Sequence, residues 1–193
     1  MPTGIPTARG VDHVGITVPD LDQAVDYFVS VLGAREVYRG PVIEDPTGTY
    51  LADHLDVHPR ARLQVAMTRW GRQQNVELLE YRAPDGRSEM PGNADVGAVH
   101  LSVDVEDIRA AWEYLADDPR NRMIGDGPQT IRDGVNDDMT WFYFRTPWGM
   151  VIECSSRTAQ SPADWPCALH RPTGPWHDEP AEDTAAPSPP SSG

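Results

Sequence analysis

Four side chains in this sequence have the types and the spacing to bind one metal ion. His13 and His100 each open a segment with strand-like alternation, whereas Glu77 and Glu153 each lie inside an apolar segment typical of a strand. A buried carboxylate without a partner is costly, so each glutamate needs an arginine, backbone donors or a cation beside it, unless it points to solvent. Two imidazoles and two carboxylates suit a divalent ion such as Zn, Ni, Co, Mn or Fe. The sequence therefore predicts one divalent metal ion bound by these four residues.

The elements that would position these residues occur twice along the chain. Each half contains a strand with the histidine, then a helix, then further strands, the last of which carries the glutamate. The expected elements of the first half are a strand at 11–18, a helix at 21–32 and strands at 34–40, 62–70 and 75–81. Those of the second half are a strand at 97–103, a helix at 105–117 and a hairpin over 139–156. Pseudo-twofold packing of the halves would bring the four side chains together.

The composition excludes several classes of partner and of chemistry. Sixteen basic residues against thirty acidic ones give a formal net charge of −14, which repels nucleic acid and anionic lipid. All the basic residues are arginine, so Schiff-base chemistry on a lysine amine is impossible. The N-terminal residues resemble neither a signal peptide nor a membrane anchor, and the two cysteines, Cys154 and Cys167, lack a CxxC spacing. We expect a cytoplasmic protein with no nucleic-acid or membrane partner.

The chain is expected to hold one domain followed by a two-part tail. The domain covers 1–156 and contains modules at about 10–82 and 96–156. Residues 157–180 carry two tryptophans, Trp165 and Trp176, and are expected to form a docking arm. The Pro- and Ser-rich end, 181–193, is predicted to be disordered.

Three segments carry a resemblance to a known family. HVGITVPDLDQAVDYFVSVLG, VHLSVDVEDIRAA and FRTPWGMVIEC resemble the two module starts and the closing strand of vicinal oxygen chelate proteins. This group includes glyoxalase I, methylmalonyl-CoA epimerase, extradiol dioxygenases and bleomycin resistance proteins. The resemblance implies an α+β fold of paired βαβββ modules that form a curved, barrel-like mixed sheet around a metal. It matches His13, His100 and Glu153 to the common ligands of catalytic members, and Glu77 to the extra ligand of bacterial-type glyoxalase I. Because family members commonly pair modules within or between chains, a homodimer is also expected.

The ligand set favours proton transfer as the chemistry. We expect a metal-dependent lyase or isomerase of the glyoxalase type, which chelates vicinal oxygens of a small molecule and abstracts a proton to give an enediolate. Glu153 is the first choice for the base and Glu77 the second. The alternatives are an extradiol-type dioxygenase and a resistance-type small-molecule-binding protein. Gln64 is expected to point inward beside Glu77, where an epimerase would profit from a second carboxylate, and this counts slightly against epimerisation.

Other residues are weaker candidates for substrate contacts. The polar stretch 44–61 is long for a loop, and it carries His54 and His58. Four arginines surround the first hairpin and could clamp an anion, although solvated positions explain them equally well: Arg60, Arg62, Arg69 and Arg72. In the last hairpin, alternate aromatic residues should pack in the core while the others line a cavity.

Overall fold

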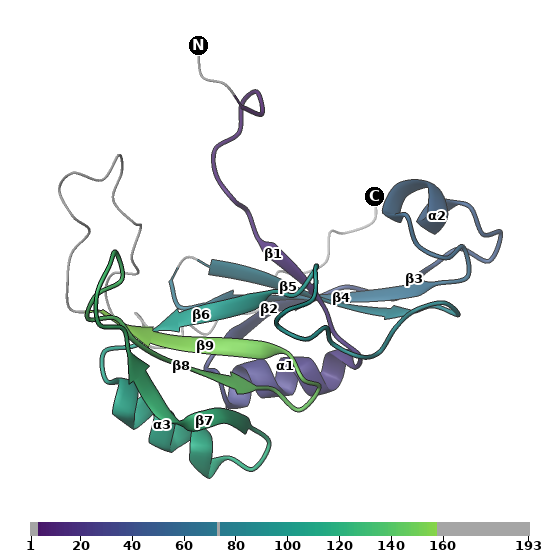
Figure 1. Cartoon of the computed structure of the whole chain (residues 1–193). Helices are drawn as coiled ribbons and strands as arrows, with labels where there is room; N and C mark the ends of the chain where they lie inside the picture. Colours follow the sequence, from purple (N-terminus) through teal and green to yellow (C-terminus); the bar gives the residue numbers. More distant parts are fainter. Residues whose placement is uncertain (1–3, 73, 158–193) are drawn as a thin grey trace, which may run out of the picture.

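The computed structural model describes residues 4–72 and 74–157, which form two β-sheets, each with its own helix (Figure 1). The first module consists of β1 (Val14–Thr17), α1 (Leu21–Ser30), β2 (Arg35–Arg39), β3 (Ile43–Glu44), α2 (Tyr50–Leu55), β4 (Arg62–Trp70) and β5 (Gln74–Arg82). The second consists of β6 (His100–Asp104), α3 (Ile108–Asp117), β7 (Arg122–Thr130), β8 (Thr140–Arg145) and β9 (Val151–Ser156). The predicted α+β fold with paired βαβββ modules is confirmed.

The two sheets have the same topology. Their strand orders are β1-β5-β4-β2, with β3 added beside β4, and β6-β9-β8-β7. In both, the first strand runs parallel to the last strand of its module, and the other neighbours are antiparallel. Strands β1, β2, β4 and β5 therefore correspond to β6, β7, β8 and β9.

Helix α1 forms where the sequence supplies a cap and an apolar face. Asp20 precedes the helix, and its side chain accepts a hydrogen bond from the backbone N–H of Gln23 at 2.8 Å. Glu80, buried in β5, accepts from the Leu21 backbone N–H at 2.8 Å and so ties the start of the helix to the sheet. Gly33 has a φ of 69° just after the helix, as the predicted left-handed cap requires.

The two modules share one hydrophobic core. Phe28 of α1 is fully buried, and its ring lies 4.9 Å from Trp70 of its own module and 6.1 Å from Trp148 of the other. In the second module, Trp112 of α3 packs edge-on against Phe142 of β8 at 5.1 Å. In Figure 1 α1 lies below β1, β4 and β5, and α3 lies beside β7 at the bottom of the view. The helix-facing sides of both sheets are therefore joined through α1.

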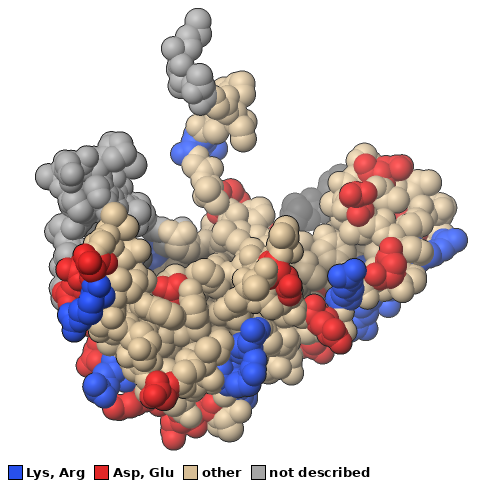
Figure 2. Space-filling view, in the orientation of Figure 1, with Lys and Arg blue, Asp and Glu red and all other residues tan. Residues whose placement is uncertain are grey.

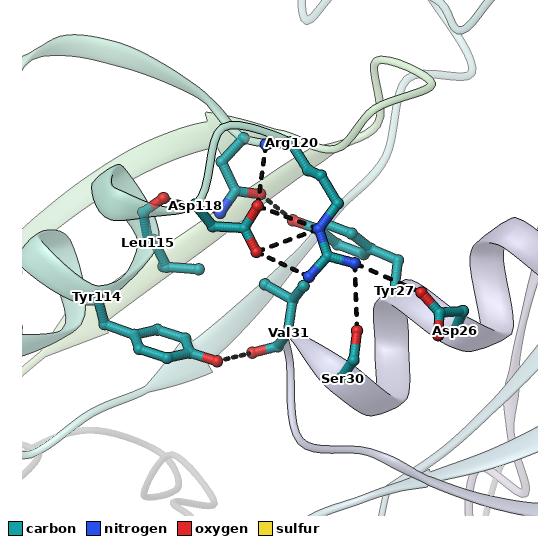
Figure 3. A network of polar contacts seen from close by, with 9 residues as sticks. Asp26, Tyr27, Ser30, Val31, Tyr114, Leu115, Asp118 and Arg120 are labelled. Atoms are coloured by element: carbon teal, nitrogen blue, oxygen red, sulfur yellow. Dashed lines mark hydrogen bonds and ion pairs between the residues drawn. The ribbon is translucent and has the colours of Figure 1, made fainter.

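A polar network reinforces this junction, and we call it the clasp (Figure 3). The Tyr114 hydroxyl of α3 donates to the backbone carbonyl of Val31 at 3.0 Å. Arg120, which follows α3, pairs with Asp118 at 2.8 Å and reaches Asp26 of α1 at 3.4 Å. The complete clasp consists of Asp26, Tyr27, Ser30, Val31, Tyr114, Leu115, Asp118, Arg120 and Asn121.

Two parts of the predicted secondary structure were wrong. Strand β7 was not expected, because its sequence RMIGDGPQT contains Gly125, Gly127 and a proline. The strand accommodates them in an irregular stretch, where its pairing with β8 shifts between Ile124 and Gln129. The stretch 44–61 is not a plain loop, since it contains α2 and the end of β3.

The remaining expectations from the sequence concern the cysteines, the C-terminal segments and the membrane. Cys154 is a free, buried thiol, and burial together with the nearby Glu153 charge raises its pKa to about 12. Cys167, the docking arm after Arg157 and the tail at 181–193 lie outside the described residues. None of the helices in the described ranges is long and apolar enough to cross a membrane.

Candidate metal centre and active site

The structure places the four predicted ligands in two histidine–glutamate pairs, one in each module. His13 Nε2 lies 3.5 Å from Glu77 Oε2, and His100 Nε2 lies 3.2 Å from Glu153 Oε2. We call these pairs the first and the second half-site.

The sheet registers show that the half-sites are equivalent positions of the repeat. Gly15 of β1 lies beside Glu77, and Ser102 of β6 lies beside Glu153. In each module the histidine precedes that partner residue by two positions, so it projects from the same side of the sheet as the glutamate. The repeat that is visible in the sequence therefore extends to single residues.

Both carboxylates lie on the sheet face opposite the helices. Glu77 is flanked along β5 by Val76 and Leu78, which are buried in the shared core. Glu153 is flanked along β9 by two core residues in the same way. Because neighbouring side chains on a strand point to opposite faces, both glutamates point away from α1 and α3.

His13 is oriented by its neighbour in the chain. Asp12 Oδ2 lies 2.8 Å from His13 Nδ1, which leaves Nε2 for Glu77. The hydrogen bond to Asp12, followed by the Glu77 charge, raises the pKa of His13, and its partial burial opposes this shift. An imidazole held through one nitrogen by a carboxylate is the usual arrangement of a metal-binding histidine.

The second half-site has the more buried glutamate and an aromatic neighbour. The Glu153 side chain is 9% exposed, against 21% for Glu77. Tyr143 of β8 lies directly across from Glu153, and its ring meets the His100 ring edge-on at 5.4 Å. Burial, the Glu153 charge and a hydrogen bond to Glu153 all raise the pKa of Tyr143, because they favour its neutral hydroxyl.

The donors of each half-site fit a divalent metal. Ligands about 2.1 Å from an ion at adjacent octahedral positions are about 3 Å apart, close to the separations of 3.5 and 3.2 Å seen here. Within the described ranges, however, no three His, Cys, Asp or Glu side chains gather closely enough to hold an ion. The four-ligand site therefore stays a prediction, supported by two half-sites of suitable chemistry.

The aromatic hairpin alternates between core and open face as expected. Phe142 and Phe144 are buried in the shared core, whereas Trp141 and Tyr143 lie on the opposite face of β8, with ring centroids 5.0 Å apart. Polar groups continue this face, since the Ser102 and Ser155 hydroxyls lie 3.2 Å apart. The face around the second half-site can thus offer hydroxyl groups and aromatic rings to a small molecule.

Gln64 is not beside Glu77, so this expectation was wrong. In the β4–β5 hairpin Gln64 pairs with Glu80, and Glu77 pairs with Met67. Gln64 therefore lies on the helix-facing side of the sheet, and its side chain donates to the Gly40 carbonyl at 3.3 Å. Gln64 therefore no longer counts against epimerisation.

The histidines and arginines proposed as weaker candidates make local contacts. His54 packs against Tyr50 within α2, and His58 Nδ1 accepts a hydrogen bond from the Arg60 backbone N–H at 3.0 Å. Arg62 pairs with Glu44 at 2.8 Å, with both side chains about half exposed. The face drawn in Figure 2 shows basic side chains scattered among acidic ones rather than collected in one patch.

Comparisons with known proteins agree with this architecture. Residues 12–137 match the Glyoxalase/Bleomycin resistance protein/Dioxygenase superfamily. The chain belongs to this superfamily. Among solved members, a glyoxalase family protein from Bacillus cereus is 18% identical with a TM-score of 0.59, and the match covers 79% of this chain and 98% of that one. A superfamily domain from Frankia sp. EAN1pec is 20% identical with a TM-score of 0.52, over 78% of this chain and 99% of that one. At these identities the likeness shows the superfamily fold alone.

A much closer superfamily relative carries an enzyme name. The chain is 44% identical over 177 residues to a 2-epi-5-epi-valiolone epimerase from Actinomyces sp, which covers 91% of this chain and 95% of the relative. The relative is an isomerase, which is the class of reaction that the sequence placed first together with lyases.

Proposed function

We propose that this chain is an epimerase that inverts one carbon of a valiolone-type, sugar-like ketone. The observation that supports this proposal most is the pair of equivalent half-sites. Each module presents one carboxylate on the sheet face opposite its helix. The relative with 44% identity over 91% of the chain supports the same class of reaction and supplies the type of substrate.

The chemistry that follows from a ketone is proton transfer at the neighbouring carbon. Epimerisation requires one group to remove the proton and another to return it from the opposite side. Glu153 and Glu77 occupy equivalent strands of different modules, and a substrate bound between the two open faces would have one of them on each side. Each is a carboxylate next to an imidazole, which holds it in place for general acid–base catalysis.

In this proposal His13, Glu77, His100 and Glu153 would also hold the divalent ion. When bound, such an ion supplies Lewis-acid polarisation of the substrate oxygens, which stabilises the negative charge that develops on proton removal. The protein's own contribution is to orient His13 through Asp12 and to place Trp141 and Tyr143 where they limit the access of water.

Solvent deuterium tests the proposal directly. The purified protein, supplied with a divalent metal, is incubated with 2-epi-5-epi-valiolone in D₂O. We expect a second epimer to form with solvent deuterium at the inverted carbon and without uptake of oxygen. Oxygen consumption in proportion to product, with no exchange at carbon, would overturn the proposal in favour of a dioxygenase. Binding without any turnover or exchange would favour the resistance-type module.

A further inference from the structure

The two half-sites differ in the residue that lies across from the glutamate. In the first module this residue is Met67 of β4, which pairs with Glu77. In the second it is Tyr143 of β8, which pairs with Glu153. The two positions are equivalent in the repeat, so the chain has a thioether at one and a phenol at the other. Only the phenol can donate a hydrogen bond to its glutamate.

Tyr143 contacts both members of its half-site. It lies directly across from Glu153 in the β8–β9 pairing, where the Glu153 charge adds to burial in raising the pKa of its hydroxyl, and its ring meets the His100 ring edge-on at 5.4 Å with an interplanar angle of 69°. Trp141 packs against the other side of the phenol, with centroids 5.0 Å apart. The aromatic neighbours leave the ring little freedom, so its hydroxyl is presented to Glu153 in a defined direction.

A hydrogen bond to one oxygen of a carboxylate restricts how the group can turn. His100 Nε2 lies 3.2 Å from Glu153 Oε2, and this contact engages the same carboxylate. A hydrogen bond from the Tyr143 hydroxyl would give this carboxylate a second partner, so that rotation of Glu153 about its terminal bond would disturb contacts with two different residues. Glu77 has His13 at 3.5 Å and a methionine across from it, so it lacks a phenol in the equivalent place.

We propose that Tyr143 is a positioning residue that fixes the Glu153 carboxylate, and with it the second half-site, for metal binding and proton transfer. The proposal rests on the proposed function for the identity of the reaction. The contact itself is independent of that function. The consequence is an asymmetric site, in which Glu153 is held by its surroundings and Glu77 depends on His13.

The first experiment measures metal affinity with Co²⁺ alone, followed by visible absorption. Tyr143→Phe removes one oxygen atom and keeps the ring, and we expect it to weaken Co²⁺ binding about 10- to 100-fold, as loss of a residue that orients a ligand does. The kcat should fall while KM stays within about twofold, because the substrate contacts are kept. Unchanged Co²⁺ affinity in the folded variant would overturn the proposal.

Tyr81→Phe is the matched control. Tyr81 lies on the same face of β5 as Glu77, and the Glu77 charge contributes to raising its pKa, after burial. It is four residues along the strand, about 13 Å away by strand geometry, instead of directly across. Its Co²⁺ affinity should stay within about twofold of the wild type. An equal loss in both variants would mean that any hydroxyl on these faces matters, and would also overturn the proposal.

A second measurement needs neither the Phe variant nor a metal. Tyrosine labelled with ¹³C at Cζ reports on hydrogen bonding of the hydroxyl. Glu153→Gln should shift the Tyr143 resonance, whereas Glu77→Gln should leave it in place. A Tyr143 resonance that ignores Glu153→Gln would show that the contact is absent. If the wild type takes up no Co²⁺ but the resonance shifts, the proposed metal chemistry fails while the positioning contact stands.

Discussion

Glu77 and Glu153 have equivalent places in the two modules, yet their surroundings differ. Glu153 is nearly buried, between His100 and Tyr143, whereas Glu77 is more exposed and faces His13. Glu80, three residues after Glu77 on β5, shows a third way to satisfy a carboxylate: it accepts hydrogen bonds from the Leu21 backbone N–H at the start of α1 and from the side chain of Arg82. A glutamate in an apolar strand thus needs a partner, but the partner differs from site to site.

At the scale of single residues, the first prediction concerns the two candidate bases, Glu153 and Glu77. Glu153→Gln keeps a polar oxygen but removes the base, so turnover should fall by about two to four orders of magnitude, with only a modest loss of metal. Glu77→Gln should be milder, because His13, His100 and Glu153 remain to hold the ion. Steady-state rates and elemental analysis of both variants are the measurements. A larger loss of turnover in Glu77→Gln would reverse the assigned order of the bases.

The second prediction concerns Asp12, which orients His13. Asp12→Ala removes the contact to Nδ1 at 2.8 Å and should weaken divalent metal binding about 10- to 100-fold. Isothermal titration with Zn²⁺ measures this. Asp53→Ala, at an exposed position in α2, serves as the control for loss of one negative charge. Equal affinities of the two variants would show that Asp12 acts only through its charge.

At the scale of elements, α1 matters most, because it packs against its own sheet and against the second module. Phe28→Ala should destabilise the protein by about 3–5 kcal/mol, since it empties a fully buried site between Trp70 and Trp148. Val29→Ala, one residue further along α1 and 41% exposed, should change stability by less than about 1 kcal/mol. Urea unfolding curves give both values, and similar midpoints for the two variants would contradict the shared core.

The clasp makes the stability of the module junction depend on pH. The hydrogen bonds from Arg120 lower the pKa of Asp118, so the carboxylate stabilises the folded state above its ordinary pKa of about 3.9 and loses this effect as pH falls. Asp118→Asn should therefore lower the melting temperature at pH 7, and the difference from the wild type should shrink below about pH 4. Asp117→Asn, at the exposed neighbouring position at the end of α3, is the matched control and should leave the melting temperature at pH 7 close to that of the wild type, because it removes none of the clasp contacts. Calorimetry across this range would refute the clasp if the Asp118 difference stayed constant.

At the scale of the whole molecule, the assembly is still a prediction. We expect a homodimer, as the family resemblance implies. Light scattering at micromolar concentration measures the mass directly. A monomer that still carries the epimerase activity would reject the dimer and would show that one chain completes the site.

The sequence by itself determined the local features and the repeat. Caps at Asp20 and Gly33, the helical spacing of α1 and the four candidate ligands are all matters of residue type and near spacing, which can be counted along the chain. The order of elements in the two halves followed in the same way, because each module repeats one supersecondary pattern.

Only the tertiary structure decided which residues lie across from one another. Gln64 and Met67 differ by an odd number of positions on β4, and the hairpin register alone determines which of them shares a face with Glu77. The phenol beside Glu153, the pairing of β7 through its irregular stretch and the clasp between α1 and α3 likewise depend on contacts between residues far apart in the chain. Such contacts arise from sheet register and packing of the assembled modules, and local periodicity does not encode either.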